Sequence, residues 1–158
     1  MDKLDEYYKF IAEKQTAVHD SGFEIADEDL NPKLFPFQRY CVKRALKTGR
    51  FAMFEDCGLG KTFQQLEWAY QVQKHINRPV LILAPLGVIG QTIKEGEHFG
   101  YEVKEIGLTV FDQDLKAGIY ITNYDNMENM DAYLFGGVVL DESSILKNFA
   151  GKTRTALI

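Results

Sequence analysis

Residues 55–62 read Glu-Asp-Cys-Gly-Leu-Gly-Lys-Thr, a combination that suits a loop around nucleotide phosphates. Glycines let backbone N–H groups close around phosphate oxygens, and a helix starting at this point adds a favourable partial positive charge. The ammonium of Lys61 would reach the β- and γ-phosphates, and the hydroxyl of Thr62 would bind Mg²⁺. The sequence therefore predicts a site for ATP and Mg²⁺ whose cofactor-binding residues include Gly58, Leu59, Gly60, Lys61 and Thr62.

This loop departs from the general phosphate-loop pattern at one position. The pattern begins with a glycine where this chain has Glu55. On these residues alone, an ordinary glycine-rich turn with a solvent-facing lysine stays open as an alternative. A second motif further along the chain is needed to decide between the two.

That second motif is a pair of carboxylates, Asp141 and Glu142, which follows the apolar residues 138–140. An acid pair at the end of a buried strand is costly unless a cation or ligand receives it. In a nucleotide hydrolase, Asp141 would hold Mg²⁺ and Glu142 would activate the attacking water. Alone, the pair could instead be a helix N-cap followed by a first-turn acid. Together with the phosphate loop, it favours a metal ligand and a general base.

The elements that must position these residues alternate along the chain. Apolar runs bounded by glycine and proline predict strands, and apolar residues at helical spacing predict helices. This alternation indicates an α/β fold with three layers and a mainly parallel sheet, in which ligands bind beyond the carboxyl ends of the strands. We expect helices over 2–18, 36–48, 87–99 and 125–131, one after the phosphate loop and one from about Lys152, and strands over 50–54, 80–84, 102–106, 118–122 and 136–141.

The composition limits the class of protein. The chain has 158 residues, 46% of them hydrophobic and 13% aromatic, which is enough for one domain with a core. Two cysteines without metal-ligand spacing, no signal peptide and no long apolar run predict a cytoplasmic protein with no membrane partner. The net charge of −5 argues against a domain that binds nucleic acid on its own.

Five segments resemble superfamily 2 helicases of the Swi/Snf type. Residues 54–62 are similar to motif I of that family, which also lacks the early glycine. Residues 34–39 look like its adenine-recognition segment, 82–89 resemble motif Ia, 119–125 resemble its Ile-Thr-x-Tyr-Glu segment, and 139–148 resemble motif II with a trailing Lys-Asn. Order and spacing fit over residues 34–158, so we divide the chain into an N-terminal helix and connector, 1–30, and a partial RecA-like ATP-binding lobe, 31–158.

The resemblance implies further site residues and partners. Gln38 would read the edge of adenine, and Pro85, Asn123, Tyr124 and Lys147 would contact nucleic acid, with DNA favoured. The chain departs from the family at Ser143-Ser144 and Gln91-Thr92, which puts the coupling to nucleic acid in doubt. It also ends before motif III and the second RecA-like lobe. Because the motif III strand normally separates the phosphate-loop strand from the acid-tipped strand, these two strands would flank a gap without it. We expect that the strand order closes up, or that another segment or a second molecule, through self-association, fills the slot.

The sequence therefore predicts the N-terminal ATP-binding lobe of an ATP-dependent DNA helicase or translocase. Lys61 and Glu142 would be its catalytic residues, and the isolated lobe would turn over slowly without an arginine finger. A small phosphate-loop kinase, a nucleotide-binding regulatory module and a non-catalytic interaction module remain alternatives.

Overall fold

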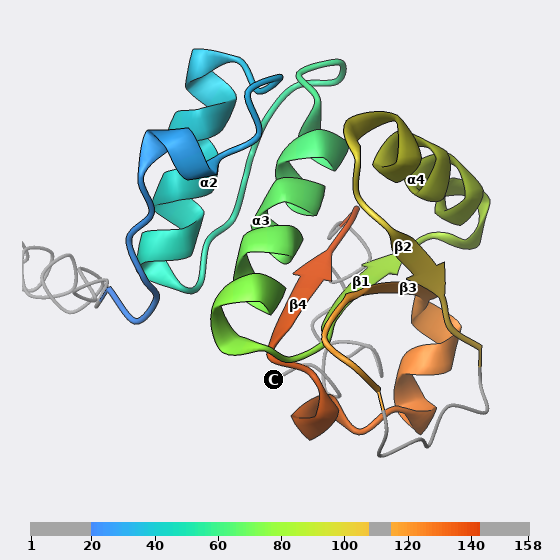
Figure 1. The fold of residues 1–158 in the computed structure, drawn as a ribbon. Helices are drawn as coiled ribbons and strands as arrows, with labels where there is room; N and C mark the ends of the chain where they lie inside the picture. The colour runs from blue at the N-terminus through green and yellow to red at the C-terminus, as the bar shows by residue number, and fades with distance from the viewer. Residues whose placement is uncertain (1–19, 108–114, 143–158) are drawn as a thin grey trace, which may run out of the picture.

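A computed structural model describes residues 20–107 and 115–142 of the chain (Figure 1). The predicted helices over 2–18 and from Lys152, together with Lys147 and Ser143-Ser144, lie outside these residues. The described elements are η1 (Asp27–Asp29), α2 (Pro36–Thr48), α3 (Lys61–Ile76), β1 (Val80–Ala84), α4 (Leu86–Phe99), β2 (Val103–Glu105), β3 (Ile119–Asn123), η2 (Tyr124–Asn129), η3 (Ala132–Leu134) and β4 (Gly137–Leu140).

The sheet is parallel throughout its four described strands, in the order β2-β3-β1-β4. Strand β1 is central, and its first residue, Val80, pairs with Ile119 of β3 on one side and with Gly137 of β4 on the other. All five residues of β1 are buried, which explains its continuous apolar sequence. The predicted α/β fold with a mainly parallel sheet is confirmed.

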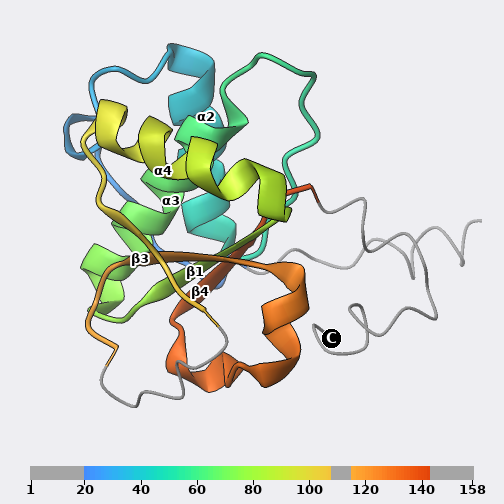
Figure 2. The ribbon, with the colours of Figure 1, turned by 90° about the vertical axis from the view of Figure 1, so that its right-hand side faces the viewer.

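Both faces of the sheet are covered, so the fold has three layers (Figure 2). Alternate residues of a strand point to opposite faces. Val80 and Ile82 belong to one core cluster, with side chains of α2, α3 and α4. Leu81 and Leu83 belong to a second cluster, which includes Met127 of η2. The second layer of helices is formed by the short 3-10 helices η2 and η3, where the sequence predicted a short helix over 125–131.

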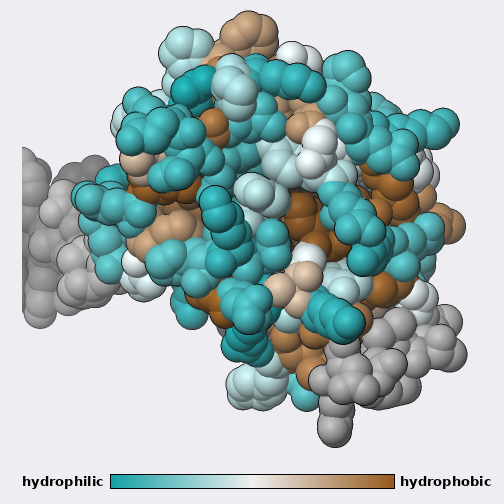
Figure 3. All heavy atoms as spheres, viewed as in Figure 1, coloured by the Kyte–Doolittle hydropathy of each residue, from teal (hydrophilic) through white to brown (hydrophobic). Residues whose placement is uncertain are grey.

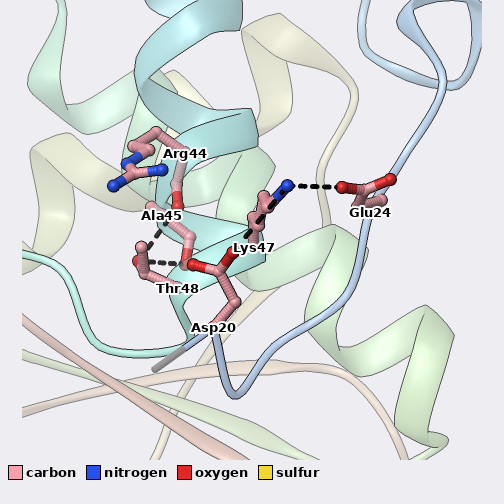
Figure 4. A network of polar contacts seen from close by, with 6 residues as sticks. All are labelled: Asp20, Glu24, Arg44, Ala45, Lys47 and Thr48. Atoms are coloured by element: carbon pink, nitrogen blue, oxygen red, sulfur yellow. Dashed lines mark hydrogen bonds and ion pairs between the residues drawn. The ribbon is translucent and has the colours of Figure 1, made fainter. Parts of the chain in front are cut away.

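The connector before α2 packs on the helical layer. Its backbone follows the end of α2 through hydrogen bonds such as that from the N–H of Phe23 to the carbonyl of Leu46, at 3.0 Å. Lys47 of α2 forms an ion pair with Glu24 at 2.6 Å and lies 3.8 Å from Asp20 (Figure 4). Leu30 is buried in the main core. Residues 20–30 therefore share the core of the domain that we predicted to begin at residue 31.

A buried polar cluster joins this connector to α3 and to the segment after α4. The carboxylate of Glu67, 1% exposed, accepts hydrogen bonds from the backbone N–H of Asn31 (3.2 Å), the side chain of Gln71 (2.8 Å) and the hydroxyl of Tyr101. The side chain of Asn31 donates to the Tyr101 oxygen at 3.0 Å. Burial and the neighbouring Glu67 raise the pKa of Tyr101. A buried carboxylate with three donors fixes the position of α3 against its neighbours.

The predicted strand over 50–54 is wrong. These residues form no regular element, and Phe54 is 93% exposed. A strand needs a neighbour for its backbone hydrogen bonds, and no described strand pairs with this segment. The sheet ends instead at β4, which does not pair with residues 50–54. Among the described strands, none lies between β4 and residues 50–54, and these two segments do not pair.

None of the helices in the described part of the chain is long and apolar enough to cross a membrane.

Candidate nucleotide-binding site

The predicted phosphate loop leads directly into α3, whose first residue is Lys61. Two glycines give the loop its shape, with left-handed φ angles of 83° at Gly58 and 76° at Gly60. A Cβ on Gly60 would lie 2.5 Å from Nε2 of Gln38, so this position also needs a residue without a side chain. The loop therefore has open backbone at the N-terminus of a sixteen-residue helix, the arrangement that binds phosphate.

The ammonium of Lys61 is bound to the loop itself. Its Nζ donates to the carbonyl of Glu55 at 2.8 Å and lies 3.4 Å from the carbonyl of Asp56. Thr62, in the first turn of α3, is half-buried. The positive charge predicted to reach phosphates is thus held at the loop by two neutral acceptors.

The acid pair lies at the same end of α3 as the loop. The side-chain amide of Gln65 donates to Oδ1 of Asp141 at 3.0 Å. Asp141 follows β4, and its N–H donates to the carbonyl of Leu83 in β1 at 2.8 Å. Gln65 is one helical turn after Lys61, so the helix that starts at the loop also touches the predicted metal ligand. The structure thus brings together the two motifs that the sequence singled out.

Glu142 follows in an uncommon backbone conformation. Its φ of 55° is left-handed, and its side chain is exposed. A non-glycine residue in this region carries a conformational cost, and such residues are frequent at active sites. Asp141 and Glu142 thus form a turn directly after β4.

Tyr124 supports the same turn from the next element. Its ring is 6% exposed, and its hydroxyl donates to the backbone carbonyl of Asp141 at 2.6 Å. Burial, followed by the negative charges of Asp141 and Glu142, raises the pKa of Tyr124 to about 12. The hydroxyl of Tyr124 thus contacts the acid pair, and its contact with nucleic acid stays a prediction.

The remaining predicted nucleic-acid residues lie near the carboxyl ends of strands. Pro85 is half-buried at the N-cap of α4. The side-chain oxygen of Asn123 accepts from the N–H of Asn126 at 3.2 Å and caps η2. Their contacts with nucleic acid stay predictions.

Gln38 joins the start of α2 to the phosphate loop. Its side-chain oxygen accepts from the N–H of Phe35 at 2.9 Å, and its amide donates to the carbonyl of Leu59 at 2.9 Å. The side chain is 4% exposed. Gln38 therefore supports the loop through its own hydrogen bonds, and its contact with adenine stays a prediction.

The chemistry of these side chains fits a magnesium nucleotide. Mg²⁺ prefers oxygen ligands and is commonly bound by one or two carboxylates together with substrate phosphates. Thr62 and Asp141 offer a hydroxyl and a carboxylate, and Lys61 offers a cation for the phosphates. No group of three or more His, Cys, Asp or Glu side chains in the described residues could hold a metal ion. A magnesium ion here would therefore rely on the nucleotide for further ligands.

An open groove of about 830 Å³ lies beside these residues. It separates residues 50–54 from β4, and Lys61, Gln65 and Trp68 of α3 contribute to its wall. Val138 of β4 is 38% exposed. In the view of Figure 1, the surface is mainly hydrophilic with a hydrophobic patch near its middle (Figure 3). The groove is where the sequence predicted a gap in the sheet.

Gln65 is a site residue that the sequence reasoning missed. Its signal is its place on α3, three and four residues after Thr62 and Lys61, on the same face of the helix. The spacing alone does not show which residue it meets, because Asp141 lies 76 positions further along the chain.

Comparison with known proteins leads to the same family that the sequence motifs resemble. No protein-family model matches the chain. The SWI/SNF-related matrix-associated actin-dependent regulator of chromatin subfamily A-like protein 1 of Xenopus tropicalis is 31% identical over 130 residues, or 77% of this chain. The Xenopus laevis protein of that name is 31% identical over 140 residues, or 83% of the chain. This chain is a Swi/Snf-type helicase-like lobe.

The lobe is a small part of such proteins. The chain spans 14% of the length of each Xenopus relative. Its fold matches the Sulfolobus solfataricus SWI2/SNF2 ATPase core in complex with dsDNA, with a TM-score of 0.63 and 22% identity, over 85% of this chain and 31% of that one. That likeness confirms the RecA-like α/β fold of the Swi/Snf-type lobe.

Proposed function

We propose that this chain is the ATP-binding lobe of an ATP-dependent DNA helicase or translocase. The observation that carries the proposal is the hydrogen bond between Gln65 and Asp141, because it brings the acid pair to the N-terminal end of the phosphate-loop helix. An ordinary glycine-rich turn would give no reason for this meeting. The Xenopus relatives support the assignment to the Swi/Snf type.

Each residue would have one role in binding and hydrolysis. Lys61 would leave the carbonyls of Glu55 and Asp56 and bind the β- and γ-phosphates. Thr62 and Asp141 would hold Mg²⁺, which neutralises phosphate charge when bound. Glu142 would orient and deprotonate the attacking water. A Cβ added at Gly58 would have no described atom within 4 Å, so the backbone there is open, which supports close approach of the phosphates.

We expect the chain by itself to bind nucleotide and to hydrolyse it slowly. Phosphoryl transfer depends on positive charge placed around the γ-phosphate, and an arginine finger contributes about 10³–10⁵ in rate. We propose that a second RecA-like lobe supplies that charge in the whole protein.

Duplex DNA is the nucleic acid that we propose for the whole protein. The structural relative is an ATPase core in complex with dsDNA. In this chain, Pro85 and Asn123 stand where strands β1 and β3 end, and Lys147 follows the acid pair in sequence. A single lobe would make only part of such an interface, in keeping with its net charge of −5.

Two further parts of the proposal concern location and assembly. The cysteines, Cys41 and Cys57, are both free thiols, which supports a reducing compartment such as the cytoplasm. Strand β4 is the outermost of the described strands on the side of the groove, which supports self-association that completes the sheet. Light scattering after size-exclusion chromatography tests the second point, and a monomer over a wide concentration range would contradict it.

Binding of a fluorescent ATP analogue, with and without Mg²⁺, tests the site. Lys61→Ala should abolish binding, whereas Lys74→Ala, the same charge change at the exposed far end of α3, should leave it intact. Equal binding by both variants would contradict the assignment of the phosphate loop. DNA-stimulated ATP hydrolysis by a longer protein that includes a second lobe separates a translocase from a kinase, for which DNA would have no effect.

A further inference from the structure

Three elements hold Asp141, the first residue of the acid pair, through its backbone and its side chain. The N–H of Asp141 donates to the carbonyl of Leu83 in β1. The side-chain amide of Gln65 in α3 donates to the Asp141 carboxylate, and the hydroxyl of Tyr124 in η2 donates to the Asp141 carbonyl. Neither of the first two contacts involves the carbonyl of the peptide between Asp141 and Glu142. The hydroxyl of Tyr124 binds that carbonyl directly, at 2.6 Å, and so holds the plane of this peptide.

That peptide leads into a residue of uncommon conformation. Glu142 has a φ of 55°, a value that costs free energy in any residue with a side chain. The carbonyl of Asp141 must be stabilised where it is if the chain is to keep this turn. A buried phenol whose hydroxyl lies 2.6 Å away provides such stabilisation, because its ring is packed in the second core cluster and cannot follow a moving peptide.

We propose that Tyr124 is a positioning residue for the metal-binding carboxylate, acting through the peptide between Asp141 and Glu142. The inference rests on the proposed function, because it takes Asp141 as the Mg²⁺ ligand. Tyr124 begins η2 directly after β3, so the hydrogen bond also connects the predicted nucleic-acid residue Asn123 to the acid pair through one neighbouring residue. A movement of the junction between β3 and η2 would therefore alter the metal site.

The chain offers a closely matched control. Tyr120, at the opposite end of β3, is also buried, and its hydroxyl also donates to a backbone carbonyl, that of Lys116, at 3.1 Å. Tyr120→Phe and Tyr124→Phe thus remove the same chemical group and the same type of hydrogen bond from the same core cluster. Only Tyr124 contacts the acid pair.

The test measures affinity for a fluorescent ADP analogue in Mg²⁺ and in EDTA, and takes the ratio of the two dissociation constants as the magnesium dependence. We expect Tyr124→Phe to reduce this ratio about fivefold, the effect of one hydrogen bond, with the affinity in EDTA unchanged. Tyr120→Phe should leave the ratio at the wild-type value. In an Asp141→Asn background, Tyr124→Phe should have no further effect on the ratio.

A purely structural role for Tyr124 predicts a different result, in which both phenylalanine variants lower the melting temperature and neither changes the ratio. That result would overturn the inference. If Asp141→Asn removes the magnesium dependence and Tyr124→Phe does not, the inference fails while the proposed site stands. If the wild-type protein shows no magnesium dependence, the proposed site and the inference fail together.

Discussion

The side-chain amide of Gln38 donates to the carbonyl of Leu59 across 2.9 Å, so the first turn of α2 holds the middle of the phosphate loop. The family resemblance gives the same glutamine a role in reading adenine. In this structure both ends of its side chain are bound to protein backbone, at Phe35 and at Leu59. These two roles of Gln38, support of the loop and recognition of the base, predict different affinities for a ligand that lacks the base.

Our first prediction separates these two roles. If Gln38 supports the loop, Gln38→Ala should lower the affinities for ATP and for inorganic tripolyphosphate by the same factor, about fivefold, because both ligands bind through the phosphate loop. Competition against a fluorescent nucleotide measures both affinities. A loss confined to ATP would show that Gln38 recognises the base.

The second prediction concerns the glycines of the loop. Alanine at Gly58 or Gly60 must adopt a left-handed φ, which costs about 1–2 kcal/mol. Gly60→Ala should cost about 1 kcal/mol more, because its methyl group would displace the Gln38 amide from Leu59. Urea denaturation measures both free energies of unfolding. In a Gln38→Ala background the two variants should become equal, and a persistent difference would contradict the proposed clash.

Glu67 is the subject of the third prediction. Replacing it with leucine leaves the Asn31 N–H and the Gln71 amide without their buried acceptor, and should destabilise the protein by about 2–4 kcal/mol. Tyr101→Phe removes the hydrogen bond to Glu67 and the acceptor of the Asn31 side-chain amide, and should cost about 1.5–3 kcal/mol. Urea denaturation compares the variants. A Glu67→Leu protein as stable as the wild type would show that the cluster contributes specificity instead of stability.

Alkaline pH provides the fourth prediction. The pKa of Tyr124 is raised to about 12 in the folded protein, against an ordinary value of 10, so the folded state favours the protonated phenol. Its contribution to stability is fully present below pH 10 and is lost as the pH rises through 12. The free energy of unfolding should therefore fall in this window. Tyr124→Phe should make this decrease in the free energy of unfolding smaller. Part of the decrease should remain, because the pKa of Tyr101 is also raised.

The sequence was sufficient where the signal is local. Strand β1 was predicted over residues 80–84 because five consecutive apolar residues suit a strand buried on both faces. Helices α2 and α4 begin within one residue of their predicted starts, and Pro36 marks the first of these boundaries. Residues 50–54 have a similar apolar composition, yet they are not a strand, since a strand also depends on a neighbour that the composition of the segment does not reveal.

Contacts between distant residues limited the prediction of the site. The phosphate loop and the acid pair are visible as separate motifs, and parallel strand order predicts that they meet. The residues that join them, Gln65 and Tyr124, have no signature, because a glutamine on a helix and a tyrosine after a strand are common. Their roles depend on the register between α3, β3 and β4, which only the folded chain defines.

The bond between Lys61 and the carbonyl of Glu55 has a consequence for ligand selection. An incoming molecule must compete with the protein for this ammonium, because the loop already supplies two oxygen atoms. A neutral nucleoside offers the lysine nothing stronger than a peptide oxygen, whereas a polyphosphate offers several negative charges. The backbone of the loop thus disfavours uncharged metabolites, because only a negatively charged ligand replaces the two carbonyls with stronger acceptors for the lysine.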